Sequence, residues 1–116
     1  MPQLVALLVT LGLELAVALA ARPELWRPVR LELARWVGLV AAASLLTHPF
    51  AWWVNGHLEL PFWWRAGIIE SGVVAAEAAL FWRVGSLGWR RALATSFATN
   101  AVSFGVGLAL YDAGIL

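Results

Sequence analysis

The sequence of 116 residues has no cysteine and no lysine, and only 13% of its residues are charged. The absence of cysteine excludes disulfides, thiolate metal ligands and cysteine nucleophiles. A soluble domain has about 25% charged and about 45–50% apolar residues, whereas this chain is 62% hydrophobic. The composition therefore indicates a small membrane protein without a separate soluble domain.

In place of charge, the sequence has long hydrophobic runs. Residues 36–58 and 92–111 contain no Asp, Glu, Lys or Arg, and a membrane span requires about 20 apolar residues. Two further runs carry few charges: residues 4–21 contain Glu14, and residues 62–82 contain Arg65 and two glutamates. No basic segment precedes the first run, so we expect a retained helix rather than a signal peptide. We predict an all-α integral membrane four-helix bundle, a single domain over residues 1–116, with spans at 4–21, 36–55, 62–82 and 92–111.

The arginines are distributed unevenly between the two sides of this predicted bundle. Seven lie in or next to the segments 22–35 and 83–91, and only Arg65 lies on the other side. Because cytoplasmic loops are enriched in basic residues, we predict that both Arg-rich loops are cytoplasmic and that the N- and C-termini are outside. The expected location is the bacterial inner membrane. All eight tryptophans fall near predicted span ends, as in an aromatic belt.

Two patterns suggest how the spans are related and associate. The motif Ser44-x-x-Thr47-His48 resembles Ser96-x-x-Thr99-Asn100, which favours a parallel internal repeat of two helical hairpins. In that repeat Glu14 and Glu77 would be equivalent. Small residues also recur every four positions in the first and third spans, which allows close helix approach. These stripes are Gly12, Ala16 and Ala20, and Gly67, Ser71, Ala75 and Ala79.

Polar residues inside the spans are the candidate site. A charged side chain at the centre of a membrane costs about 2.5–3.5 kcal/mol on insertion scales, so such residues mark function by default. The structural alternative is a hydrogen bond that joins two helices. The candidates for binding an ion or a small solute are Glu70, His48, Glu14, Asn100 and Glu77.

Counting residues from the helix ends predicts how these side chains pair. Glu70 and His48 both fall in the outer half of the bundle, and we expect a direct pair. A carboxylate next to an imidazole suits a proton relay or a cation site. Asn100 is the expected partner of Glu14. Glu77 lies near the inner boundary, where we expect it to face headgroup water or to pair with a loop arginine such as Arg90.

The favoured function is therefore the binding or relay of a proton, a cation or a small polar solute, by a homo-oligomer or together with other membrane subunits. One alternative is a non-catalytic accessory subunit of a larger membrane complex, in contact with a pigment or a lipid. A second alternative is a minimal intramembrane hydrolase. Under the favoured function, we expect no enzyme activity, no catalytic residue and no cofactor. A metal site built from His48, Glu70 and Glu14 has no spacing motif to support it, and none is expected. The partner is the lipid bilayer, and no basic patch indicates nucleic acid.

Three resemblances accompany these residues. Glu14 in the first span resembles the essential glutamate of small multidrug resistance transporters, but the further carboxylates in residues 62–82 and the arginine bias depart from that family. Intramembrane Glu, His and Asn are similar to those of CAAX-type proteases, although the adjacent glutamates of that family are absent. Thr47-His48-Pro49-Phe50, the Glu70/Glu77 pair, and Thr99-Asn100 with Ser103-Phe104 resemble a group of uncharacterised small four-span bacterial membrane proteins. That resemblance covers most of the chain and implies no particular activity.

Overall fold

The computed structural model describes residues 2–22, 24 and 31–114, which form four α-helices and no strand. All four helices overlap the predicted ranges, so the all-helical fold is confirmed. Three of them, α1, α2 and α4, are long and apolar enough to cross a membrane, and the span predicted over residues 62–82 stays a prediction. The helices are α1 (Pro2–Ala21), α2 (Leu31–His57), α3 (Phe62–Arg83) and α4 (Trp89–Asp112).

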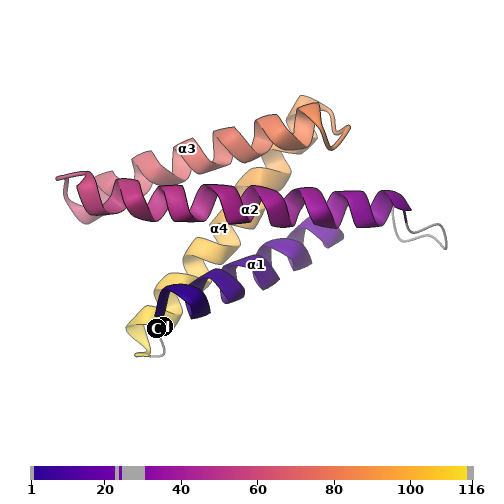
Figure 1. Cartoon of the computed structure of the whole chain (residues 1–116). Helices are drawn as coiled ribbons and strands as arrows, with labels where there is room; N and C mark the ends of the chain where they lie inside the picture. The colour runs from indigo at the N-terminus through magenta and orange to yellow at the C-terminus, as the bar shows by residue number, and fades with distance from the viewer. Residues whose placement is uncertain (1, 23, 25–30, 115–116) are drawn as a thin grey trace.

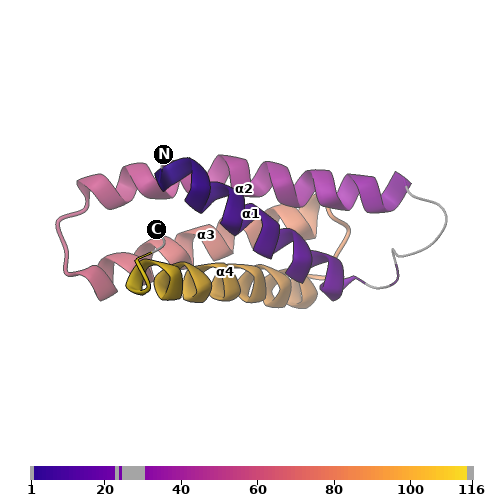
Figure 2. The same cartoon turned by 90° about the horizontal axis from the view of Figure 1, so that it is seen from below.

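The helices alternate in direction along the bundle. Figures 1 and 2 show both chain termini and the α2–α3 connection at one end, and the α3–α4 turn at the other. Helix α1 packs against α2 and α4, and α3 packs against the same two helices. We call the end with the α3–α4 turn the basic end and the opposite end the terminal end. The described arginines of the basic end are Arg22, Arg35, Arg83, Arg90 and Arg91.

Helix α2 is longer than predicted. It begins at Leu31 rather than near residue 36, with Glu32 in its first turn, where a carboxylate interacts favourably with the helix dipole. Pro49 lies inside α2 without ending it. Part of the predicted loop 22–35, including Arg27 and Arg30, lies outside the described residues.

The α3–α4 turn is tightly packed at the basic end. The carbonyl oxygen of Gly85 accepts a hydrogen bond from Nη1 of Arg22 at 2.8 Å, and the backbone N–H of Leu87 donates to the carbonyl oxygen of Phe81 at 3.3 Å. A Cβ at Gly85 would lie 2.6 Å from the Phe81 carbonyl oxygen. Glycine is therefore required at this position because backbone approaches backbone too closely for a side chain.

Next to this turn lies a buried apolar cluster, which we call the apolar layer. The rings of Trp36 and Phe81 meet edge to face with centroids 5.1 Å apart, and Trp36 Nε1 donates to the carbonyl oxygen of Ala18 at 3.0 Å. Trp36 was expected at a membrane boundary but is only 2% exposed, because it packs between helices. The apolar layer comprises Ala18, Trp36, Val40, Ala43, Phe81, Leu87 and Ala92.

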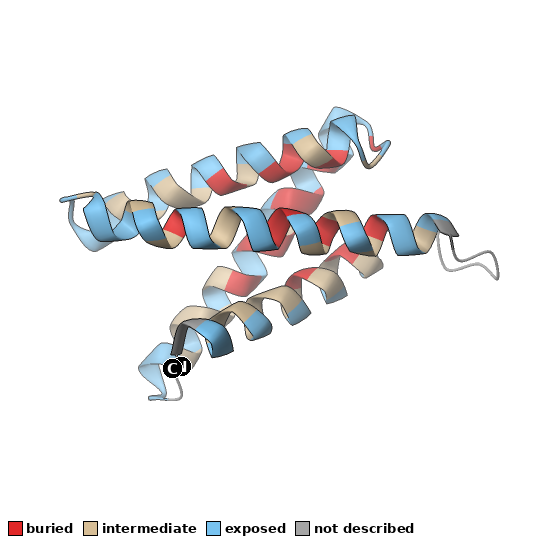
Figure 3. Ribbon diagram, viewed as in Figure 1, coloured by how far each residue is buried: buried red, intermediate tan, exposed pale blue. Residues whose placement is uncertain are grey.

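In Figure 3 the buried positions lie on the faces that the helices turn toward one another, with several on α4. The two small-residue stripes lie elsewhere. Every residue of both stripes is exposed, including Gly12 in α1 and Gly67 in α3. These stripes therefore do not pack the helices of one chain together, and they remain open for contact with other helices.

Candidate functional site

One helical turn from the apolar layer, toward the terminal end, the interior becomes polar. On each helix, a fully buried polar residue lies four positions from a buried apolar one, a rise of about 6 Å. We call this second level the polar layer. The four pairs are Glu14 and Ala18, Ser44 and Val40, Glu77 and Phe81, and Ser96 and Ala92.

Glu14 has no exposed surface and interacts with three side chains from two helices. Nε2 of His48 lies 3.0 Å from its Oε1, the hydroxyl of Ser44 donates to its Oε2, and the hydroxyl of Ser103 donates to Oε1 at 3.5 Å. The predicted pairing of Glu14 with Asn100 was therefore wrong. Both Ser44 and His48 lie on the same face of α2, four residues apart, so the sequence contained a signal for the role of Ser44.

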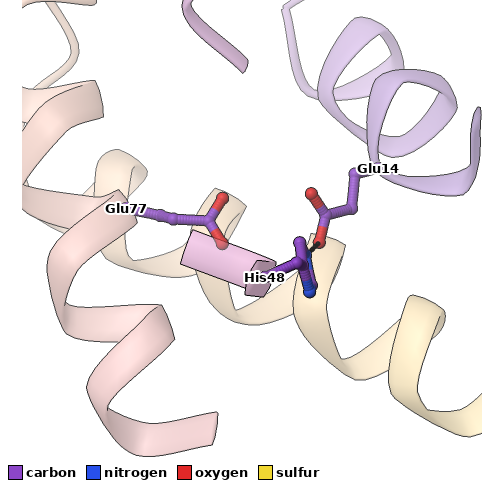
Figure 4. Close-up of side chains that lie close together, drawn as sticks. All are labelled: Glu14, His48 and Glu77. Carbon is purple, nitrogen blue, oxygen red and sulfur yellow. Dashed lines mark hydrogen bonds and ion pairs between the residues drawn. The ribbon is translucent and has the colours of Figure 1, made fainter. Parts of the chain in front are cut away.

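Glu77 is also fully buried, and it points from α3 toward Glu14 and His48 (Figure 4). The hydroxyl of Thr47 donates to its Oε1 at 3.5 Å, whereas its Oε2 has no hydrogen-bond partner. The prediction that Glu77 faces headgroup water or Arg90 was wrong, because Arg90 instead lies over the ring of Trp89.

Three donor groups thus converge from three helices, and we call them the triad: Glu14, His48 and Glu77. One ligand atom from each residue lies within 4.8 Å of the others. The two carboxylates have no exposure, while 12% of the His48 side chain is exposed. His48 is thus the triad residue with surface exposed to the surroundings in this structure.

Asn100 adjoins the triad from α4. Its Nδ2 donates to the carbonyl oxygen of Ser96 at 2.8 Å, and its Oδ1 is buried without a partner. The hydroxyl of Ser96 donates to the carbonyl oxygen of Val74 at 2.7 Å and thereby links α4 to α3. Because the Ser96 hydroxyl bonds to a backbone carbonyl, it needs no side chain as an acceptor. Oδ1 of Asn100 is thus an acceptor that no described residue uses.

Glu70 lies outside the triad. It is half-buried and lines a groove of about 270 Å³ between α3 and α4, together with Trp63, Phe97 and Asn100. The predicted pair of Glu70 with His48 was wrong, since His48 pairs with Glu14. The cause is the tilt of each Cα–Cβ bond toward the N-terminus of its helix. In antiparallel helices, His48 reaches toward the basic end and Glu70 toward the terminal end.

The described arginines make no contact with the triad. Arg65 donates to the carbonyl oxygen of Leu60, Arg91 pairs with Glu24, and Arg22 contacts Gly85. Within the described part of the chain, the triad therefore contains two carboxylates and one imidazole but no guanidinium. This donor set can hold protons or a small cation.

Comparisons with models of protein families, with curated proteins and with solved structures gave no match for this chain. The resemblances drawn from individual motifs stay predictions. The equivalence of Glu14 and Glu77 in an internal repeat likewise stays a prediction. The chemistry of the site is accordingly inferred from its donors, their burial and their charge.

Proposed function

We propose that this chain is a membrane protein that binds a cation, a proton or a metal ion, at the triad and passes it across the bilayer. The observation that carries this proposal is the meeting of two fully buried carboxylates with a single imidazole. Burial in a low dielectric strongly disfavours an uncompensated carboxylate. An imidazolium at His48 balances one of the two, so the second requires a further positive charge.

A purely structural role explains these contacts less well. An interhelical hydrogen bond needs one acceptor and one neutral donor, and Ser44 with Glu14 already supplies one. Glu77 adds a second carboxylate whose Oε2 has no partner. Buried charges that lack a close partner are costly to a fold. We infer that Glu77 is present because a mobile cation occupies the site during function.

The surroundings of the triad differ between its two ends. The apolar layer separates the triad from the basic end, and His48 is the only triad residue with exposed surface. We infer that the cation enters past His48, and that release toward the basic end requires the apolar layer around Phe81 to open. A carrier needs such a closed side, because a continuous polar path would leak ions.

Ion flux into proteoliposomes tests this proposal. Purified protein is reconstituted around a pH-sensitive dye or a Zn²⁺-sensitive dye, and a gradient of each cation is imposed. We expect faster entry of one cation than in empty liposomes. Glu77→Gln should reduce the rate to that of empty liposomes, while Glu70→Gln, a matched change on the same helix, should leave it unchanged. Wild-type rates equal to those of empty liposomes for both cations would refute the proposal.

A second candidate, an accessory subunit of a larger membrane complex, is favoured by the exposed small-residue stripes. Gly12, Ala16 and Ala20 on α1 all face outward, so another membrane helix can approach α1 closely. Affinity purification from native membranes in a mild detergent tests this function. A second chain recovered at a fixed stoichiometry supports it, and recovery of this chain alone contradicts it.

A further inference from the structure

We infer that the triad binds a single divalent first-row transition-metal cation of the Zn²⁺ and Fe²⁺ class, and this inference rests on the proposed cation-binding function. The three ligands are one carboxylate oxygen of Glu14, Nε2 of His48 and one carboxylate oxygen of Glu77 (Figure 4). They come from α1, α2 and α3, so a bound metal would join three helices.

The spacing of the donors is close to that of a metal site. With metal–ligand bonds of about 2.0–2.2 Å, two ligands of a tetrahedral site lie about 3.3–3.6 Å apart. Nε2 of His48 and Oε1 of Glu14 are already 3.0 Å apart, and no pair of the chosen ligand atoms exceeds 4.8 Å. Rotation about the side-chain torsions of Glu77 can bring its carboxylate oxygen closer to the other two ligand atoms, to the spacing of a tetrahedral site.

The donor types select the class of metal. Ca²⁺ and Mg²⁺ prefer oxygen ligands alone, whereas a combination of imidazole and carboxylates suits Zn²⁺, Fe²⁺ and related cations. Three protein ligands also leave one coordination position open, which is typical of sites that exchange a ligand rather than of closed structural sites. The triad would therefore leave a bound metal one position for an exchangeable ligand such as water.

A single divalent cation satisfies the charge balance of the triad without an imidazolium at His48. Glu14 and Glu77 carry two negative charges when ionised, and neither has exposed surface. One divalent cation with a neutral His48 makes the cluster electrically neutral. Metal ligands must be deprotonated. Both glutamates would therefore bind the metal as carboxylates, and His48 would bind it as a neutral imidazole.

Two unpartnered oxygens provide an independent indication of a missing ligand. Oε2 of Glu77 and Oδ1 of Asn100 are both buried without a hydrogen-bond partner, and more than about 90% of buried polar groups normally have one. A cation gives Glu77 Oε2 its partner.

Hydroxyls next to the triad donate to its carboxylates. Ser44 donates to Oε2 of Glu14, and Thr47 donates to Oε1 of Glu77. Oε1 of Glu14 faces Nε2 of His48 and lies 3.5 Å from the hydroxyl of Ser103, whereas Oε2 of Glu77 has no partner. The Thr47 hydroxyl donates mainly to the carbonyl oxygen of Ala43, at 2.8 Å. Outer-shell hydrogen bonds fix ligand orientation in metal sites. Ser44 is therefore a positioning residue.

Binding of Co²⁺ to the purified full-length protein in detergent tests the inference. Co²⁺ bound by these ligands gives visible absorption bands, and Zn²⁺ should abolish them by displacement. We expect saturation at a single Co²⁺ per chain. Glu77→Gln and His48→Gln should weaken binding by more than about 100-fold, and Ser44→Ala by about tenfold, as expected for loss of an outer-shell partner. Glu70→Gln, with unchanged helix content and elution volume, should bind as the wild type does.

Several results would overturn the metal assignment. Wild-type protein without stoichiometric Co²⁺ binding would do so, as would equal losses in Glu70→Gln and Glu77→Gln, or displacement of Co²⁺ by Mg²⁺ as readily as by Zn²⁺. If metal binding fails but Glu77-dependent proton flux persists, the inference fails and the proposed function stands. If Co²⁺ binds at the triad but no cation crosses the bilayer, the metal site stands and the proposed transport fails.

Discussion

The apolar layer and the polar layer occupy neighbouring turns of the same four helices and differ in what they contribute. Phe81 and Trp36 in the apolar layer fill space, and Nε1 of Trp36 donates to the carbonyl oxygen of Ala18. Glu77, one turn away from Phe81, is equally buried but leaves an oxygen unpaired. The comparison indicates that the first layer stabilises the fold, whereas the second holds a buried carboxylate at an energetic cost.

The largest expected effect comes from emptying the apolar layer. Phe81→Ala removes a fully buried ring that packs against Trp36, and we expect a loss of about 3–5 kcal/mol in the free energy of unfolding. Denaturation in mixed micelles, followed by circular dichroism, measures it. Phe97→Ala is the matched control, because Phe97 is 64% exposed. Equal losses in the two variants would show that the apolar layer has no special role in stability.

A change of opposite sign is expected in the polar layer. Glu77→Met removes a buried carboxylate, and without metal it should raise the free energy of unfolding by about 1–4 kcal/mol while abolishing cation binding. The donors next to Glu77 keep other acceptors, since the Thr47 hydroxyl donates to the Ala43 carbonyl at 2.8 Å and Nδ2 of Asn100 donates to the Ser96 carbonyl. Unfolding in the presence of a chelator is the measurement.

Glu14→Met is the control for this substitution. It would leave the donors of Ser44 and His48 without their acceptor, at a cost of about 1–3 kcal/mol for each buried group. We therefore expect Glu14→Met to be less stable than Glu77→Met. A loss of stability in Glu77→Met as large as that in Glu14→Met would contradict the distinction between the two carboxylates.

The smallest effect is expected outside both layers, at the basic end. Nη2 of Arg91 lies 2.7 Å from Oε1 of Glu24 in an exposed pair, and exposed pairs contribute about 0–1 kcal/mol. The pKa of Glu24 is lowered by a hydrogen bond from the backbone of Glu24 itself and by further hydrogen bonds from Arg91 and Arg22. The contribution is thus present at neutral pH and is lost as pH falls through that lowered pKa.

Thermal unfolding of Arg91→Ala at neutral and acidic pH measures this contribution. We expect a small loss of stability at neutral pH and no difference from wild type once Glu24 is protonated. A loss as large as that of Phe81→Ala would mean that the basic end, rather than the apolar layer, stabilises the bundle.

The fold was more predictable from the sequence than the pairing inside it. Uncharged runs of sufficient length define helices almost by themselves, since a span of apolar residues has few other stable structures in a membrane. The pairing depended on side-chain direction. Glu70 and His48 lie at similar distances from the α2–α3 connection, but their side chains tilt in opposite directions, so His48 meets Glu14 instead. Counting residues along the helices could not show this.

The candidate residues themselves were mostly identifiable, because buried carboxylates and imidazoles stand out in an apolar sequence. Glu14, His48 and Glu77 do converge, and Asn100 is buried on α4. The hydroxyl of Ser44 was harder to identify, since serine in a membrane helix usually bonds to its own backbone. Only its contact with Glu14 distinguishes it from Thr99, which donates to the Ser96 carbonyl.

The spacing of one turn between the two layers also limits how the helices can be aligned during folding. Helix α1 consists mostly of Leu, Ala and Val, and such a surface can pack against its neighbours at several heights with similar energy. A shift of one turn would bring Glu14 to the level of Ala18, next to Trp36 and Phe81, where it would lack a polar partner. Buried polar groups elsewhere fix helix register in this way. The same carboxylate that we assign to cation binding would therefore select, as the bundle assembles, the single vertical alignment in which the site exists.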